Sequence, residues 1–149
     1  MTSGSAAADP VVRRRSRVRR IGALVLLAAT ITGGLAVHRL LPDTAATDVA
    51  GDALYALAAY LLVVALAPRW PSLAPGGVSA AWCVAVELFQ LTGIPLALGA
   101  HFMPAMLVLG TVFDPRDLVV YVVTVAVATL VDGVSRWAVA RGARDSSPA

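Results

Sequence analysis

The chain has 149 residues, and 58% of them are hydrophobic while only 14% are charged. Soluble domains carry about 25% charged residues, so this composition excludes an ordinary soluble protein and favours one whose apolar side chains face lipid. The net charge is +3, all twelve basic residues are arginine, and the single cysteine, Cys83, excludes an internal disulfide and a cysteine-based metal cluster.

Residues 1–20 are predicted to form a disordered, basic N-terminal segment, because their first part is mostly small residues without a hydrophobic period. The arginines gather at the end of this segment, at Arg13, Arg14, Arg15, Arg17, Arg19 and Arg20. Basic runs can bind nucleic acid. This run has no interleaved aromatic residues and adjoins an apolar stretch, so we interpret it as a topology anchor and expect no nucleic-acid partner.

Four apolar stretches are predicted to cross the membrane as helices, at about residues 21–41, 52–67, 78–98 and 118–139. About twenty residues span the roughly 30 Å of hydrocarbon in a bilayer, and the first stretch is too long for the apolar core of a cleaved signal peptide. Pro42 ends the first helix, and Pro95 is expected to kink or end the third. The predicted fold is an all-α integral membrane bundle of four transmembrane helices, with the lipid bilayer as partner.

Residues 99–116, between the third and fourth spans, fit neither a polar loop nor a full span. They are largely apolar, yet Pro104 and Gly110 interrupt any long helix. We therefore expect a re-entrant or interfacial segment here. Residues 140–149 are polar and are predicted to form a cytoplasmic tail.

The distribution of arginine predicts the orientation. With four spans, both termini lie on one side, and every arginine except Arg39 and Arg116 lies on that side. Because arginines near span ends are retained in the cytoplasm, we expect a multi-pass protein of the bacterial inner membrane with both termini cytoplasmic. The tryptophans, Trp70, Trp82 and Trp137, are expected at the cytoplasmic interface, where indole rings prefer to lie.

Glu87 and Gln90 are polar residues inside a predicted span. Counting about 1.5 Å per residue from the start of the third span places Glu87 near mid-depth, and Gln90 lies one turn later on the same face. A charged residue at that depth costs about 3 kcal/mol, so it usually has a partner or a role. The pair can bind a polar ligand, relay a proton or hydrogen-bond to a neighbouring helix, and the functional and structural interpretations stay equally open.

Further polar residues are expected on the outer side of the membrane. Asp52 and Asp117 begin the second and fourth helices, so both can also act as helix caps; the cap is preferred for Asp52, and both roles stay open for Asp117. The predicted outward-facing polar pocket has six candidate binding residues: Glu87, Gln90, Asp117, Asp52, Tyr121 and His101. One histidine with scattered carboxylates does not make a metal site, and we predict neither a metal nor a cofactor.

Asp132 differs from these acids because it lies near the cytoplasmic end of the fourth helix. Arg136 follows four residues later, which is the favourable acid-first order on a helix. We predict a structural ion pair between the two side chains.

Several short motifs resemble those of a known family in order and spacing. They are Gly51-Asp52-Ala53-Leu54-Tyr55-Ala56, then Glu87-Leu88-Phe89-Gln90 with Pro95, then Leu107-Val108-Leu109-Gly110-Thr111-Val112-Phe113, and finally Asp117-Leu118 with Tyr121. Through them, over roughly residues 21–132, the chain resembles the bacterial domain-of-unknown-function 2809 (DUF2809) family of small four-helix membrane proteins. This resemblance implies a fold and site candidates but no activity.

A more distant resemblance is to the VanZ-like family, which shares a Glu-x-x-Gln on one helix and an Asp on the next. Some members of that family are linked to glycopeptide-antibiotic resistance at the cell envelope. The chain departs from both families between Pro95 and Leu107, where Gly-Ala-His-Phe-Met at residues 99–103 stands in place of an expected arginine. The Asn-containing signature of the fourth VanZ-like helix is also absent. The resemblance therefore does not imply an anionic-ligand site built on that arginine.

Three functions follow as hypotheses. The preferred one is a cell-envelope protein whose outward-facing polar pocket binds an envelope lipid or a partner membrane protein. The second is a VanZ-like intramembrane enzyme acting on an envelope lipid, with Glu87 as its acid or base. The third is a subunit of an oligomeric transporter, because four helices rarely enclose a pathway alone. The oligomeric state stays open.

Overall fold

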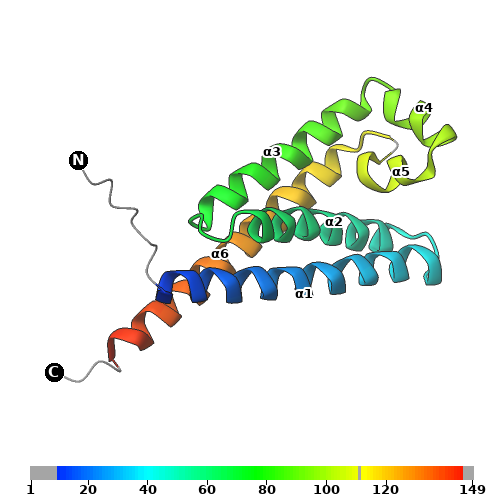
Figure 1. Ribbon diagram of the computed structural model, residues 1–149. Coiled ribbons are helices and arrows are strands. Elements are labelled where there is room, and N and C mark those ends of the chain that lie inside the picture. The colour runs from blue at the N-terminus through cyan, green and yellow to red at the C-terminus, as the bar shows by residue number, and fades with distance from the viewer. Residues whose placement is uncertain (1–9, 111, 146–149) are drawn as a thin grey trace.

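The computed structural model describes residues 10–110 and 112–145, and the regular structure of these residues is entirely helical (Figure 1). The six helices are α1 (Pro10–Leu40), α2 (Ala45–Leu66), α3 (Leu73–Gln90), α4 (Ile94–His101), α5 (Met103–Leu109) and α6 (Pro115–Asp145). Four of them, α1, α2, α3 and α6, are long and apolar enough to cross a membrane. The predicted all-α fold with four membrane-spanning helices is confirmed.

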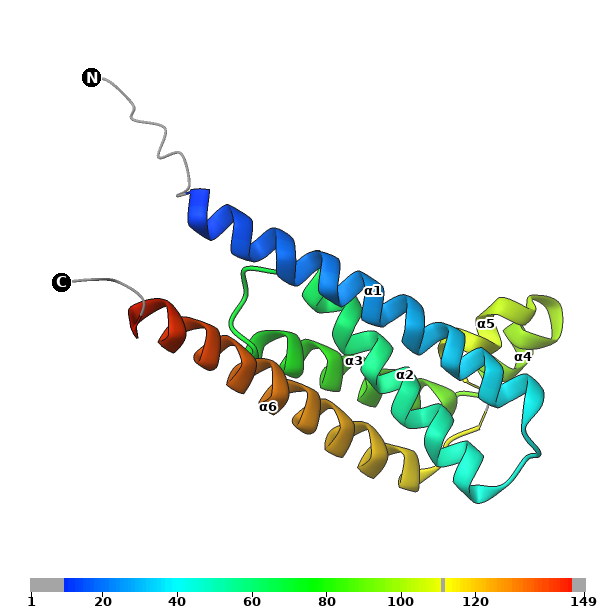
Figure 2. The same cartoon turned by 90° about the horizontal axis from the view of Figure 1, so that it is seen from below.

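The long helices form a bundle with α2 at its centre. α2 packs against α1, α3 and α6, and α3 packs against α6. Among the helices described, the backbone of α1 lies close to that of α2 alone. The start of α1 and the end of α6 lie at one end of the bundle, and α4 and α5 lie at the other (Figures 1 and 2). We call these the terminal end and the α4–α5 end. Four passes thus return the chain to the side on which it began.

The first two helices begin earlier than the sequence predicts. α1 starts at Pro10, so residues 10–20, predicted to be disordered, form its first turns; a proline suits this position because it needs no hydrogen-bond acceptor there. α2 starts at Ala45, because Thr44 caps it: the Thr44 hydroxyl accepts from the Thr47 N–H at 3.3 Å, and the Thr47 hydroxyl accepts from the Thr44 N–H at 2.8 Å. Residues 1–9 lie outside the described ranges.

The predicted third span, 78–98, is two helices in the structure. α3 ends at Gln90, and the chain turns at Gly93, whose φ of +70° is a conformation that glycine adopts without strain. Pro95 then lies in the first turn of α4, so the break precedes the proline. The predicted segment 99–116 contains the end of α4 and all of α5, and its re-entrant or interfacial position stays a prediction.

The last helix is longer than predicted at both ends. It runs over Pro115–Asp145, so residues 140–145 of the predicted polar tail continue the helix. Residues 146–149 of that tail lie outside the described ranges. The extra turns carry α6 past the end of its apolar stretch, which is consistent with a helix that projects from the membrane at the terminal end.

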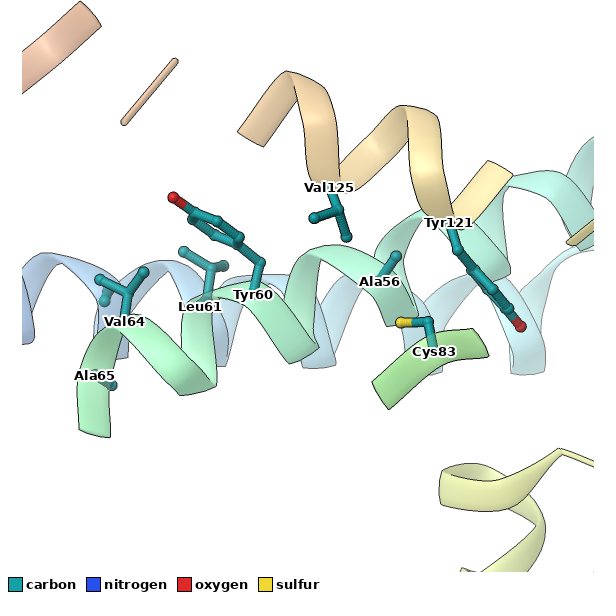
Figure 3. Close-up of a cluster of buried hydrophobic side chains, with 9 residues drawn as sticks. Ala56, Tyr60, Leu61, Val64, Ala65, Cys83, Tyr121 and Val125 are labelled. Carbon is teal, nitrogen blue, oxygen red and sulfur yellow. The ribbon is translucent and has the colours of Figure 1, made fainter. Parts of the chain in front are cut away.

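The buried core is small and centres on α2 (Figure 3). Ala56, Tyr60 and Val64 of α2 pack against Cys83 of α3 and Val125 of α6. Cys83 is completely buried, as expected of a small packing residue. Most apolar side chains of α1 and α6 are exposed, which suits helices that face lipid.

Two core tyrosines direct their hydroxyl groups away from each other. In Figure 3 the hydroxyl of Tyr60 points toward one end of the bundle and that of Tyr121 toward the other. Tyr60 reaches an acid of the terminal end, and Tyr121 reaches the acids of the α4–α5 end. The apolar core therefore separates two polar clusters.

Candidate functional site

Five of the six predicted site residues come together at the α4–α5 end, where α2, α3 and α6 meet. Glu87 and Gln90 lie in the last turn of α3, and Asp117 and Tyr121 in the first turns of α6. Asp52, from α2, lies within interaction range of Asp117 and Glu87. We call these five residues the acidic cluster.

Glu87 is completely buried although it lies in the last turn of a helix. Its Oε1 accepts a hydrogen bond from the backbone N–H of Asp114 at 2.7 Å. Its Oε2 is buried and has no hydrogen-bond partner among the described residues. The predicted mid-depth position is wrong, because α3 ends at Gln90 and Glu87 therefore lies in the last turn of the span.

Gln90, like Glu87, binds the backbone between α5 and α6 or at its edge. Its Nε2 donates to the carbonyl of Leu109 at 3.0 Å, while its Oε1 is buried without a partner in the described part of the chain. Gly110 makes this approach possible: its φ is +63°, and a Cβ at this position would collide with the carboxamide of Gln90. The Glu-x-x-Gln motif thus holds the backbone that follows α5.

Neither Asp52 nor Asp117 caps a helix. Asp52 lies inside α2, and Asp117 lies in the first turn of α6. Thr44 caps α2, which leaves Asp52 inside the helix, so the preferred cap role for Asp52 is wrong. The cap of α6 is Asp114, whose Oδ1 accepts from the Arg116 N–H at 2.8 Å. Asp117 therefore faces the acidic cluster, and its Oδ1 is buried without a hydrogen-bond partner.

Positive charge is scarce around these acids. Arg116 approaches Asp117 Oδ1 to only 3.9 Å with its Nε, and it also lies 3.7 Å from Asp114 Oδ2. The Arg116 side chain is 45% exposed, so solvent screens its charge. Arg116 is therefore a distant and solvent-exposed counter-charge for three acids, Asp52, Glu87 and Asp117. The cluster has more hydrogen-bond acceptors than donors.

Two residues of this end were not predicted as site residues. The Tyr55 hydroxyl donates to the Val108 carbonyl at 2.7 Å and accepts from the Trp82 indole N–H at 3.0 Å. Trp82 lies midway along α3, away from the terminal end of the bundle near which it was predicted. The sequence offered one indication of a role for Tyr55, because it lies in the family-like motif that begins at Gly51.

His101 does not join the acidic cluster. It is exposed at the end of α4, and its Nδ1 lies 3.1 Å from the carbonyl of Ala97 in its own helix. Its neighbour along the chain, Phe102, is also exposed. In residues 10–110 and 112–145, no three His, Cys, Asp or Glu side chains are arranged to hold a metal ion.

A second polar cluster lies at the terminal end and is paired throughout. The Arg19 guanidinium binds both carboxylate oxygens of Asp132, at 3.3 and 2.5 Å, and the Tyr60 hydroxyl donates to Asp132 Oδ2 at 3.1 Å. Arg19 Nη1 also donates to the carbonyls of Pro68 and Trp70, both at 2.8 Å. We call this arrangement the arginine clamp. It joins α1, α2, α6 and the turn between α2 and α3.

The predicted partner of Asp132 is therefore wrong. Arg136 donates to the carbonyl of Trp70 at 2.5 Å, on the same turn that Arg19 holds. Helical spacing made Arg136 a possible partner, but Arg19 reaches Asp132 from a helix 113 positions away in sequence and binds it with two nitrogens. A bidentate guanidinium contact outweighs a single exposed pair along one helix.

Comparison with known proteins identifies a family but no activity. A family model described as "Protein of unknown function (DUF2809)" matches residues 41–125, which include the whole acidic cluster. Searches of curated proteins and of solved structures found no significant match.

Proposed function

The chain belongs to the DUF2809 family, and from its acidic cluster we propose that it is a membrane protein of the cell envelope that binds a lipid head group carrying hydrogen-bond donors. The donors would be the ammonium or hydroxyl groups of the head group. The observation that carries this proposal is a set of three buried oxygen atoms without donors: Glu87 Oε2, Gln90 Oε1 and Asp117 Oδ1.

The chemistry of these atoms selects the class of ligand. All three are acceptors, and buried acceptors without donors are rare and costly in folded proteins. The acids around them repel an anion, and Arg116 is too exposed to compensate. An N–H or O–H donor satisfies the acceptors, and an ammonium group also offsets the negative charge.

One strip of backbone is bound at several points by side chains at this end of the bundle. Tyr55, Gln90 and Glu87 bind the backbone of Val108, Leu109 and Asp114, respectively. We call residues 108–110 and 112–114 the closing segment. Because Glu87 is completely buried beneath it, we infer that the segment moves when a head group enters. Gly93 and Gly110, the described glycines with positive φ, lie at the two boundaries of the α4–α5 region.

The test compares lipids that differ in donors but not in net charge. Phosphatidylethanolamine and phosphatidylcholine are both zwitterionic, but only the first has ammonium N–H groups; a glucosyl-diacylglycerol supplies uncharged hydroxyl donors. We expect native mass spectrometry of the full chain in mild detergent to show retention of the two donor lipids over phosphatidylcholine. Equal retention of all three lipids would overturn the proposal.

Two variants test whether the acidic cluster causes that selectivity. Glu87→Gln keeps an acceptor for the Asp114 N–H but places an amide N–H₂ where Oε2 was, so we expect at least tenfold weaker binding of the donor lipids. Asp43→Asn is the matched control, because Asp43 is an exposed acid in the turn between α1 and α2. Equal loss in both variants would show that general negative charge, and not the cluster, selects the lipid.

We also propose that the membrane is the bacterial inner membrane and that both termini are cytoplasmic. The terminal end holds every arginine except Arg39 and Arg116, and arginine-rich ends are retained in the cytoplasm. Reporter fusions at each terminus test this orientation: a fluorescent protein that folds in the cytoplasm should be bright at both ends. An active periplasmic alkaline phosphatase fusion at either end would contradict it.

A further inference from the structure

A basic groove lies at the terminal end, opposite the end that holds the acidic cluster. It adjoins the arginine clamp, because Pro68 and Trp70 belong to both. It has a volume of about 990 Å³ and runs between the first turns of α1 and the turn after α2. Its charged lining consists of Arg13, Arg14, Arg17, Arg20 and Arg69. We call it the arginine groove.

The two walls of the groove are held together by hydrogen bonds. Arg13, Arg17 and Arg20 follow each other at helical spacing and so lie along one face of α1. The opposite wall, with Arg69, is tied to α1 because Arg19 binds the carbonyls on either side of that residue, and Arg20 Nε donates to the Ala65 carbonyl at 2.9 Å. The fold therefore positions Arg69 on the opposite wall from the α1 arginines. No local sequence pattern predicts this arrangement.

The charge of this groove is uncompensated. No acidic residue lines it, and within the described ranges none of its five arginines takes part in a salt bridge. Arg19, one position before Arg20, shows the contrast, because Asp132 neutralises it. Five like charges held around one space repel one another and favour an anion between them.

The groove becomes apolar toward the membrane. Ile21 of α1, Leu66 of α2 and Trp70 also line it, and Ile21 follows the groove arginines along α1. From Ile21 to Val37, α1 contains no charged residue. Leu24 and Val25, which follow Ile21, are exposed on the surface of the bundle. A ligand that fills this space therefore carries negative charge at one end and hydrocarbon at the other.

We propose that the arginine groove binds the phosphate head group of an anionic phospholipid from the leaflet at the terminal end. Guanidinium groups bind phosphate oxygens with two nitrogens each, and basic pockets between transmembrane helices are suited to anionic head groups. The acyl chains then lie along the apolar surface of α1 and α2. This site is independent of the proposed head-group site at the α4–α5 end, which selects donors and repels anions.

The experiment measures binding of phosphatidylglycerol and phosphatidylcholine to the full chain in mild detergent, by native mass spectrometry. For the wild type we expect phosphatidylglycerol to bind at least tenfold more tightly, and its affinity to fall as salt increases. Free glycerol phosphate at the same concentration should not compete, because it lacks acyl chains. Equal affinity for the two lipids, or full competition by glycerol phosphate, would overturn the proposal.

A pair of double variants separates a defined site from diffuse positive charge. Arg17→Gln/Arg69→Gln removes one arginine from each wall, and we expect it to weaken phosphatidylglycerol binding about tenfold or more. Arg15→Gln/Arg141→Gln removes the same charge from the same end, at exposed arginines outside the groove, and should change the affinity less than threefold. Equal losses in the two double variants would overturn the site.

Folding of the variants is checked by thermal unfolding without anionic lipid. If Arg17→Gln/Arg69→Gln does not fold, Arg17→Lys/Arg69→Lys takes its place. This variant keeps the charge but loses the bidentate geometry, so we expect a smaller but measurable loss of phosphatidylglycerol affinity. Unchanged affinity in this variant would contradict guanidinium recognition of the phosphate.

Discussion

The two polar clusters at opposite ends of this bundle differ in how their acids are paired. In the arginine clamp, Asp132 receives hydrogen bonds from Arg19 and Tyr60. In the acidic cluster, three acids share one exposed arginine, and Glu87 and Asp117 each retain a buried oxygen without a donor. Both clusters contain aspartate and tyrosine, and both lie at the edges of the same core.

This difference in pairing indicates a structural role for the arginine clamp and a binding role for the acidic cluster. A paired acid that joins three helices stabilises their arrangement, and its loss leaves the partner charge uncompensated. Unpaired buried acceptors reduce stability, and natural proteins retain such groups where function uses them. Removing the carboxylate of Asp132 should therefore lower the free energy of unfolding, whereas replacing the carboxylate of Glu87 should not.

The largest effect is expected from Asp132→Ala. Arg19 would lose its counter-charge in a site where the two side chains are only 14% and 19% exposed, so we expect the free energy of unfolding to fall by about 3 kcal/mol. Denaturant unfolding in mild detergent measures this. The control Arg19→Met/Asp132→Leu removes both charges and should be more stable than the single variant. Wild-type stability of Asp132→Ala would contradict the structural role of the clamp.

Gly110→Ala should have the next largest effect. Its positive φ and the carboxamide of Gln90 leave no room for a Cβ, so we expect a loss of about 2 kcal/mol in stability. Gly77→Ala is the matched control, since a Cβ there meets nothing within 4 Å and the residue lies inside α3. It should be neutral or slightly stabilising. Similar unfolding temperatures for the two variants would argue against the tight contact at Gly110.

Tyr55→Phe tests how firmly the closing segment is held. The hydroxyl that binds the Val108 carbonyl and the Trp82 indole is removed, and we expect stability to fall by about 1 kcal/mol. Amide hydrogen exchange in the closing segment should accelerate. Trp82→Phe leaves the bond from Tyr55 to Val108 in place and should accelerate exchange less. An unchanged exchange rate in Tyr55→Phe would mean that this bond does not hold the segment.

The smallest effect on stability is expected from Glu87→Gln. The amide oxygen can still accept from the Asp114 N–H, and a neutral amide costs less to bury than a carboxylate. We therefore expect a thermal unfolding temperature equal to or above that of the wild type. A clear decrease would show that Glu87 holds the helices together, and the acidic cluster would then belong with the clamp as a structural feature.

Sequence patterns predicted the fold more completely than the site. Glu87, Gln90, Asp117 and Tyr121 were recognisable because polar residues are rare in apolar helices. The roles of Asp52 and Trp82 were misjudged for one reason: each depended on a helix boundary that lies elsewhere in the structure. Thr44 moves the start of α2 away from Asp52. α3 begins at Leu73 and not at the predicted residue 78, which places Trp82 midway along the helix.

By itself, the sequence determined the class of protein, the four spans and the gathering of arginines at one end, because lipid constrains each segment separately through its length, hydropathy and flanking charge. Only the tertiary structure decided which partners meet. Asp132 pairs with Arg19 and not with Arg136, His101 stays apart from the acids, and Arg69 completes a groove with α1. Such choices depend on how helices distant in sequence pack together, and helical spacing describes only neighbours on one helix.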